Sequence, residues 1–343
     1  MNIYKLLNIY THIKSHRLRA LGILAMHLLR RRYTCMFFDP VLACNLRCRM
    51  CYFSDDEKRK SLHGFFSEEE LSLIARKVFP YLRKLQIGCG AEPTLYRHLD
   101  KVVSLGKQYG VPYIALTTNG NLLNPSKLER LVACGLDEIT LSVHGMRQAS
   151  YEFLMDRARF DTFKQLVEDL KEIKKSHPHF AVRINYTINE DNVEDLKLFP
   201  QVFQELHIDT LQLRPIQKIG NSKYDNFSMA HVLEHYDDSI LPLVKHCQER
   251  GTRCIYPTRE NMARLHEGAD RNSTETSNYV SDMVPYFQLS PWERWKEDFN
   301  PYEEDFYQYC RRKHRIKTLL YGIFLSGRRS SDYVTKSMNY EVG

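Results

Sequence analysis

Three cysteines lie close together in the first fifth of the chain, at Cys44, Cys48 and Cys51, with the spacing Cys-x3-Cys-x2-Cys. Thiolates at this spacing can close around one metal centre, and ligation by sulfur alone selects zinc or an iron–sulfur cluster. A structural zinc site needs a fourth cysteine or histidine nearby, and none follows within the next eleven residues. Three ligands leave one corner of a four-iron cluster open. The loop therefore favours an iron–sulfur centre over zinc.

The loop resembles the cluster loop of the radical S-adenosylmethionine (SAM) superfamily in its cysteine spacing, in the Asn45–Leu46 filler and in Tyr52. This resemblance implies a [4Fe-4S] cluster on the three cysteines, with the amino and carboxylate groups of SAM on the open iron. It implies reductive cleavage of SAM to methionine and a 5′-deoxyadenosyl radical that removes hydrogen from a substrate. The implied partners are a small-molecule or peptide substrate and an external electron donor of the flavodoxin or ferredoxin type.

Further matches to the superfamily follow successive predicted strands. The segment 90–93 resembles the GGEP motif, whose backbone and acid hold the SAM ammonium group, although Ala91 replaces the second glycine. The segment 117–120 is similar to a polar strand end that lies near SAM in relatives. The segment 142–145 stands where many relatives have Ser-x-Asp, with His144 in place of the acid. The resemblance thus implies SAM contacts from Gly90, Ala91, Glu92, Pro93, Thr118, Asn119 and Ser142.

Three residues on or just after the next two predicted strands complete the expected cofactor site. Arg183 and Arg214 each carry a guanidinium group that can bind a carboxylate through two hydrogen bonds. A surface ion pair or a contact at the rim of a barrel is the alternative for both arginines. Asn189 is expected to line the adenosine part of the site.

The elements that must position these residues alternate between β-rich runs and helical patterns from residue 33 to about residue 215. We predict strands at 35–42, 84–89, 113–118, 138–143, 181–187 and 210–213. Helix starts are predicted at Ser67 with Glu70, at Asn124 before a proline, and at Asp191 with Glu194. Chemistry in parallel α/β folds sits at the carboxyl ends of the strands. The predicted fold is a partial (β/α)6 TIM-like barrel of the α/β class.

We predict three parts along the chain: a basic amphipathic helical extension at 1–32, the barrel at 33–215, and an irregular, α-rich substrate or cap region with a basic tail at 216–343. The last part holds Cys247, Cys254 and Cys310 without a CxxC pair, so we predict no auxiliary cluster. Its residues 286–309 include nine aromatics. These are expected either to cover the barrel mouth as a lid or to pack on the barrel side.

Charge and cysteine content narrow the class of protein. The chain of 343 residues has nine cysteines, an odd number, which favours reduced thiols and a cytoplasmic location. Of the net charge of +7, residues 1–38 contribute +7 and residues 311–343 contribute +6, which leaves −6 for the body. A nucleic-acid enzyme more often has a basic stripe through its body, so no nucleic-acid partner is expected.

The basic, partly apolar ends are expected to pack on the body of the protein, with docking on the anionic inner face of a membrane as the alternative. Three arginines at 30–32 follow the apolar run 20–29, where a signal peptide would have small residues, and the run is too short to span a bilayer. The function predicted is that of a radical SAM enzyme. A peptide maturase of the same superfamily and a non-catalytic iron–sulfur or zinc protein are the alternatives.

Overall fold

The computed structural model describes residue 13, residues 15–217, residue 219, residues 221–224, residues 227–266, residues 286–324 and residues 341–342. Residues 1–12 and 14 of the helical extension predicted at 1–32 therefore lie outside the described residues.

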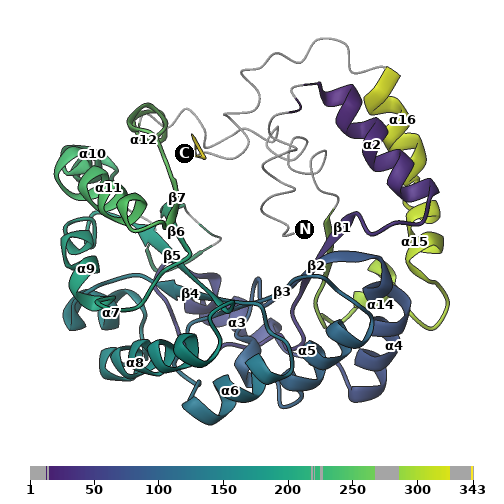
Figure 1. The fold of residues 1–343 in the computed structure, drawn as a ribbon, viewed down its shortest axis with the longest axis horizontal. Coiled ribbons are helices and arrows are strands. Elements are labelled where there is room, and N and C mark those ends of the chain that lie inside the picture. The colour runs from purple at the N-terminus through teal and green to yellow at the C-terminus, as the bar shows by residue number, and fades with distance from the viewer. Residues whose placement is uncertain are drawn as a thin grey trace.

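A curved sheet with the strand order β8-β1-β2-β3-β4-β5-β6-β7-β9 forms the centre of the fold (Figure 1). The strands are β1 (Thr34–Phe38), β2 (Leu82–Ile87), β3 (Ile114–Thr118), β4 (Glu138–Val143), β5 (Ala181–Ile188), β6 (Thr210–Pro215), β7 (Arg253–Tyr256), β8 (Tyr286–Leu289) and β9 (Glu341–Val342). Neighbours from β8 to β7 are parallel, and β9 is antiparallel to β7. The partial barrel predicted from the sequence is confirmed, with a parallel strand added at each edge.

Helices cover the outer face of this sheet, and the ring they form is open between β7 and β1 (Figure 1). They are α2 (His16–Leu28), α3 (Asp56–Ser61), α4 (Glu68–Val78), α5 (Leu99–Gln108), α6 (Pro125–Ala133), α7 (Gln148–Leu154), α8 (Phe160–Ser176), α9 (Phe199–Val202), α10 (Ala230–Glu234), α11 (Leu241–Glu249), α12 (Arg259–His266), α14 (Trp295–Asp298), α15 (Phe306–Arg312) and α16 (Arg315–Phe324). A π-helical turn, η5 (Tyr236–Ile240), joins α10 to α11.

Two of the predicted helix starts are confirmed and the third is wrong. Ser67 and Glu70 form a reciprocal capping box at α4, and the Asn124 side chain accepts a hydrogen bond from the Lys127 amide at α6. The third segment forms a 3-10 helix, η4 (Glu194–Leu198), followed by the short α9. The Asp191 carboxylate accepts a hydrogen bond from the Tyr224 hydroxyl and does not cap a helix.

The two faces of the sheet differ in polarity, as β5 illustrates. Its burial alternates along its whole length. Val182, Ile184 and Tyr186 are buried towards the helices. Arg183 and Asn185 alternate with them and face the inside of the barrel, because successive side chains of a strand point to opposite faces. The inner face is therefore the polar one, and it is where a ligand can be recognised.

Of the two arrangements expected for the aromatic segment 286–309, the structure has packing on the barrel side and not a lid over the mouth. Strand β8 pairs with β1 in parallel register. Behind it, the side chains of Phe287, Phe299 and Phe306 are buried and contact one another edge to face. Burial of several aromatic rings against a sheet edge is favourable through the hydrophobic effect, whereas a lid would expose them.

Helices α2 and α16, from opposite ends of the chain, lie side by side beyond β1 (Figure 1). The His27 Nδ1 atom lies 2.7 Å from the Tyr33 hydroxyl and ties α2 to the barrel. Residues 15–32 and 311–324 contain no Asp or Glu. Large apolar side chains are nevertheless exposed on both helices and just beyond α2, at Leu18, Leu21, Leu28, Leu29, Ile316, Leu320, Tyr321 and Phe324. In the described part of the chain, no helix is long and apolar enough to cross a membrane.

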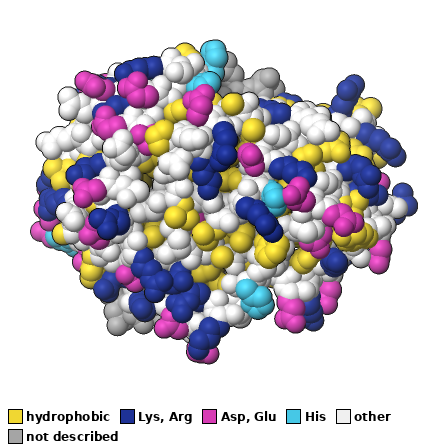
Figure 2. Space-filling view, turned by 90° about the horizontal axis from the view of Figure 1, so that it is seen from below, with side chains coloured by type: hydrophobic (Ala, Val, Ile, Leu, Met, Phe, Trp, Pro, Cys, Tyr) yellow, Lys and Arg dark blue, Asp and Glu magenta, His cyan; other side chains and the backbone are white. Residues whose placement is uncertain are grey.

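The face seen in Figure 2 has a different character. Lys and Arg side chains are interspersed there with Asp and Glu side chains, and apolar atoms lie between them. A mixed surface of this kind is typical of solvated helices.

Candidate active site

The cysteine loop follows β1 and is fixed by backbone hydrogen bonds to distant segments. The amides of Arg47 and Arg49 donate to the carbonyl groups of Asp156 and Leu154, at 2.9 Å each. The Arg47 guanidinium donates back to the Cys44 carbonyl at 2.8 Å. The loop is therefore held at the carboxyl end of β1 by the segment that ends α7.

The three thiol groups of this loop influence one another. Burial raises the pKa of Cys44 to about 12, and the pKa of Cys48 is raised first by burial and then by its neighbours Cys51 and Cys44. This mutual effect places the sulfurs near a common point. Within the described residues, however, the three sulfurs do not all lie within 4.8 Å of one another. Tetrahedral zinc would hold them about 3.8 Å apart. The three sulfurs are therefore not arranged as they would be around a single zinc ion.

The loop after β2 is held by Asp39, a buried residue at the end of β1. Its carboxylate accepts hydrogen bonds from the amides of Cys89, at 2.7 Å, and Gly90, at 3.2 Å, and from the Ser290 hydroxyl, at 3.0 Å. The Tyr52 hydroxyl donates to the Gly90 carbonyl. A side chain at Gly90 would place its Cβ 2.7 Å from that hydroxyl oxygen, so a larger residue there would displace the Tyr52 hydroxyl. Asp39 was not predicted, although an acid directly after a buried strand is a recognisable signal.

The Glu92 carboxylate is fully buried and satisfied by its own chain. One oxygen accepts from the Thr94 amide at 3.1 Å, the Thr94 hydroxyl at 2.5 Å and the Thr118 hydroxyl at 2.7 Å. The other accepts from the Asn119 amide at 2.8 Å. Burial raises the pKa of Glu92, and these hydrogen bonds oppose the rise. The carboxylate thus joins the ends of β2 and β3. Its predicted contact with the SAM ammonium group stays a prediction.

Two buried polar atoms at the ends of β4 and β5 have no hydrogen-bond partner among the described residues: the His144 Nδ1 atom and the Asn189 Nδ2 atom. The neighbouring backbone is satisfied, because the Asn192 side chain donates to the His144 carbonyl at 2.9 Å and accepts from the Asn189 amide at 2.8 Å. A buried polar atom without a partner costs about 1–3 kcal/mol. These atoms are suited to a polar ligand at the barrel mouth, such as SAM.

The two predicted arginines meet on the inner face of the barrel. The Arg183 and Arg214 guanidinium groups both donate to the Gln212 side-chain oxygen, and Arg183 also donates to Asn185 at 3.0 Å. Arg214 lies at the carboxyl end of β6 and is exposed at the barrel mouth. Arg183 is the third residue of β5 and lies deeper in the barrel. The rim contact considered from the sequence therefore describes Arg214 better than Arg183.

The predicted SAM-binding residues other than Arg183 gather at the carboxyl ends of β2 to β6, the edge that also carries the cysteine loop. Sequence reasoning missed Asp39 and Asn192, and it treated His144 only as a departure from a motif. The three cysteines of the last third lie elsewhere. The Cys247 and Cys254 thiols contact each other in a buried position, while the Cys310 sulfur lies 3.8 Å from the Tyr33 hydroxyl.

Comparison with known proteins agrees with this arrangement. The family model described as the Radical SAM superfamily matches residues 40–199. The "Probable GTP 3',8-cyclase" of Sulfurisphaera tokodaii is 27% identical over 215 residues, which are 60% of this chain and 66% of that protein. The protein of the same name from Saccharolobus solfataricus is 29% identical over 185 residues, 53% of this chain and 56% of that protein. The matched regions thus span less than two thirds of these relatives.

Solved structures share the fold. The Streptococcus suis SuiB structure bound to S-adenosylmethionine gives a TM-score of 0.56 at 14% identity, covering 77% of this chain and 60% of that one. The structure of anSMEcpe with bound AdoMet gives 0.51 at 17% identity, covering 64% and 62%. The family match, the relatives and the shared fold all agree with the position of the cysteine loop at the carboxyl end of β1. The family match assigns residues 40–199 of this chain to the radical SAM superfamily, and the relatives and the shared fold agree with that assignment.

Proposed function

We propose that this enzyme cleaves SAM at a cluster bound by Cys44, Cys48 and Cys51, and that it removes a hydrogen atom from an anionic substrate held inside the barrel. The observation that carries the SAM site is the pair of unpartnered buried atoms, His144 Nδ1 and Asn189 Nδ2, at the barrel end that also carries the cysteine loop. When bound, the cluster and SAM supply the electron and the 5′-deoxyadenosyl radical.

The chain itself would bind and orient SAM. The backbone of residues 88–93 is held in place by Asp39, Tyr52 and Glu92, and it presents the loop that resembles the GGEP motif. Ser142 and Asn189 would contact SAM from the adjacent strand ends. Burial lowers the pKa of His144 to about 4, so its imidazole is neutral at neutral pH. A neutral imidazole can either accept or donate a hydrogen bond at its Nδ1 atom.

The charge of the strands supports an anionic substrate. Of the charged residues in β1 to β8, Glu138 is acidic, whereas five are basic: Arg83, Lys84, Arg183, Arg214 and Arg253. Arg183 pairs with Thr210, and Thr210 pairs with Arg253 on the next strand. Arg183 and Arg253 therefore lie on the same face of the sheet. Glu138 lies 3.7 Å from Lys84. A carboxylate or a phosphate would suit Arg183 and Arg214, because guanidinium binds either group through paired hydrogen bonds.

Two substrate classes are worth testing first. The curated relatives bear the name GTP 3',8-cyclase, and a nucleoside triphosphate carries the phosphates that the inner arginines suit. A SuiB structure is described as bound to its precursor peptide, and an acidic peptide would meet the same requirement. We favour a phosphate-bearing small molecule, because Arg183 and Arg214 meet on the inner face of the barrel and not on an outer surface.

The test is substrate-stimulated cleavage of SAM by the reconstituted enzyme under anaerobic conditions. Candidate phosphorylated and carboxylated compounds, GTP among them, are added separately, and 5′-deoxyadenosine is measured by mass spectrometry. An anionic substrate should stimulate cleavage and be altered itself. Stimulation by neutral compounds alone would contradict the proposed substrate class but not the SAM chemistry.

We also propose that α2 and α16 form a surface that docks on an anionic membrane. In support, both helices expose large apolar side chains, including Leu29 and Phe324 at their ends. Exposed basic residues flank them, including Arg31 and Lys317, and no acid lies within 15–32 or 311–324. This combination is typical of helices that lie in a membrane interface.

A further inference from the structure

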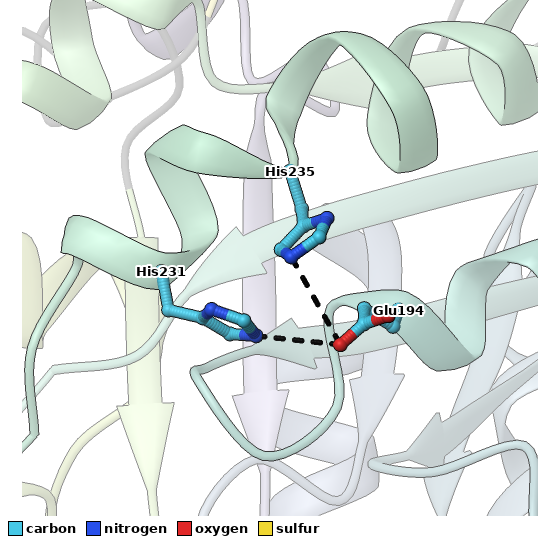
Figure 3. Close-up of side chains that lie close together, drawn as sticks. All are labelled: Glu194, His231 and His235. Carbon is cyan, nitrogen blue, oxygen red and sulfur yellow. Dashed lines mark ion pairs between the residues drawn. The ribbon is translucent and has the colours of Figure 1, made fainter.

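Outside the barrel mouth, Glu194, His231 and His235 converge from two segments that follow neighbouring strands (Figure 3). Glu194 begins η4, which follows β5. His231 lies in α10, which follows β6, and His235 comes one turn later, immediately before the π-helical turn η5. The side chains of residues four apart lie on the same face of a helix, so both imidazoles point towards the same carboxylate.

The distances between these groups are informative. The Glu194 Oε1 atom lies 3.5 Å from the His231 Nε2 atom and 3.9 Å from the His235 Nε2 atom. Both separations exceed the usual 2.7–3.2 Å or so of a hydrogen bond to nitrogen. A tetrahedral zinc ion with bonds of about 2.0–2.1 Å separates its ligand atoms by about 3.4 Å. The observed spacing is therefore closer to that of metal ligands than to that of hydrogen-bonded partners.

The other nitrogen of each imidazole faces a carboxylate three residues further along the chain. His235 Nδ1 lies 3.1 Å from the Asp238 carboxylate, and His231 Nδ1 lies 3.7 Å from that of Glu234. A carboxylate at Nδ1 favours the tautomer that carries its proton there, which leaves the Nε2 lone pair for a metal.

We propose that Glu194, His231 and His235 bind a divalent transition-metal cation such as zinc. The bound cation would link the segment after β5 to the segment after β6. Two imidazoles and one carboxylate are a ligand set that zinc uses with water in the fourth position. The side chains are partly exposed, so water can reach that position. The site is separate from the cysteine loop, and the proposal does not depend on the reaction at the barrel mouth.

The test uses the holoenzyme with its cluster in place, so that the cluster cysteines are occupied. Zinc binding is measured by calorimetry, and metal content is measured after desalting. We expect one equivalent of zinc in addition to the cluster iron, together with a higher unfolding temperature in zinc. Both effects should be lost in His235→Ala and in Glu194→Gln.

The matched control is His207→Ala, because His207 is an exposed histidine 3.9 Å from a carboxylate, that of Asp209. This variant should bind zinc like the unaltered enzyme. Zinc binding that survives both His231→Ala and His235→Ala, or that is lost equally in His207→Ala, would overturn the proposal. Failure to bind zinc at all would overturn it as well.

Discussion

Replacing Glu92 by glutamine separates two roles that this residue could have in the SAM site. The carboxylate accepts hydrogen bonds on both oxygens, including bonds from the amides of Thr94 and Asn119. A glutamine has one acceptor oxygen, so either orientation of its amide leaves one of these backbone N–H groups without an acceptor. The cost of one such unsatisfied buried donor is about 1–3 kcal/mol.

We therefore expect Glu92→Gln to lower the free energy of unfolding of the cluster-free chain by about 1–3 kcal/mol, as measured by urea unfolding. Thr118→Val is the matched variant, because it removes the hydroxyl that lies 2.7 Å from the same carboxylate and keeps a β-branched side chain on the strand. The two changes should be less than additive, since both groups belong to one hydrogen-bond network.

SAM affinity of the reconstituted enzyme is the second measurement. If Glu92 acts by holding the ends of β2 and β3, Thr118→Val should weaken SAM binding in proportion to its effect on stability, as Glu92→Gln does. The reasoning would be refuted if Glu92→Gln abolished SAM binding and left the free energy of unfolding unchanged. That result would place the carboxylate directly on SAM.

Three further predictions concern other residues. Burial lowers the pKa of His144 from 6.5 to about 4. The free energy of unfolding, measured in urea, should therefore be highest above pH 6.5 and fall by about 3 kcal/mol as the pH drops from 6.5 to 4. An equally steep fall in His144→Asn would contradict this prediction. Arg183→Gln should raise the KM for an anionic substrate more than the KM for SAM. Arg130→Gln, which changes an exposed residue on a helix, should change neither KM. Equal effects of Arg183→Gln on both constants would count against the proposed substrate site. Leu29→Glu should reduce sedimentation of the protein with phosphatidylserine vesicles at low salt, whereas Leu241→Glu, on the opposite side of the barrel, should not. If the unaltered chain does not sediment with these vesicles, the membrane proposal is wrong.

The barrel could be predicted from the sequence because its strands and helices repeat with strong local signals. Each of β1 to β6 is rich in apolar and β-branched residues and is bounded by turn or cap residues. The Ser67 capping box marks the start of its helix to the residue. Strand β8 was missed. It has only four residues, and it is specified by pairing with β1, which lies about 250 residues earlier in the chain. No local pattern reports a contact of that kind.

The loops of the candidate site could be predicted from the sequence, but the contacts between their side chains could not. Motifs at strand ends identified the cysteine loop and the loop after β2, because a parallel sheet brings all its carboxyl ends to one edge. The partners of Glu92 were not predictable, nor was the shared contact of Arg183 and Arg214 with Gln212. Both depend on the register between strands, which a sequence pattern does not fix. The grouping of Glu194 with His231 and His235 depends in the same way on how two loops meet.

Reductive cleavage of SAM by the anaerobically reconstituted enzyme tests the central claim most directly. With a chemical reductant, the enzyme should hold about four irons on its three cysteines and release 5′-deoxyadenosine and methionine. Cys48→Ala should do neither and keep a folded barrel by circular dichroism. Zinc in place of iron on the three cysteines, with no cleavage by the unaltered enzyme, would contradict the account. Full cleavage by Cys48→Ala would contradict it as well.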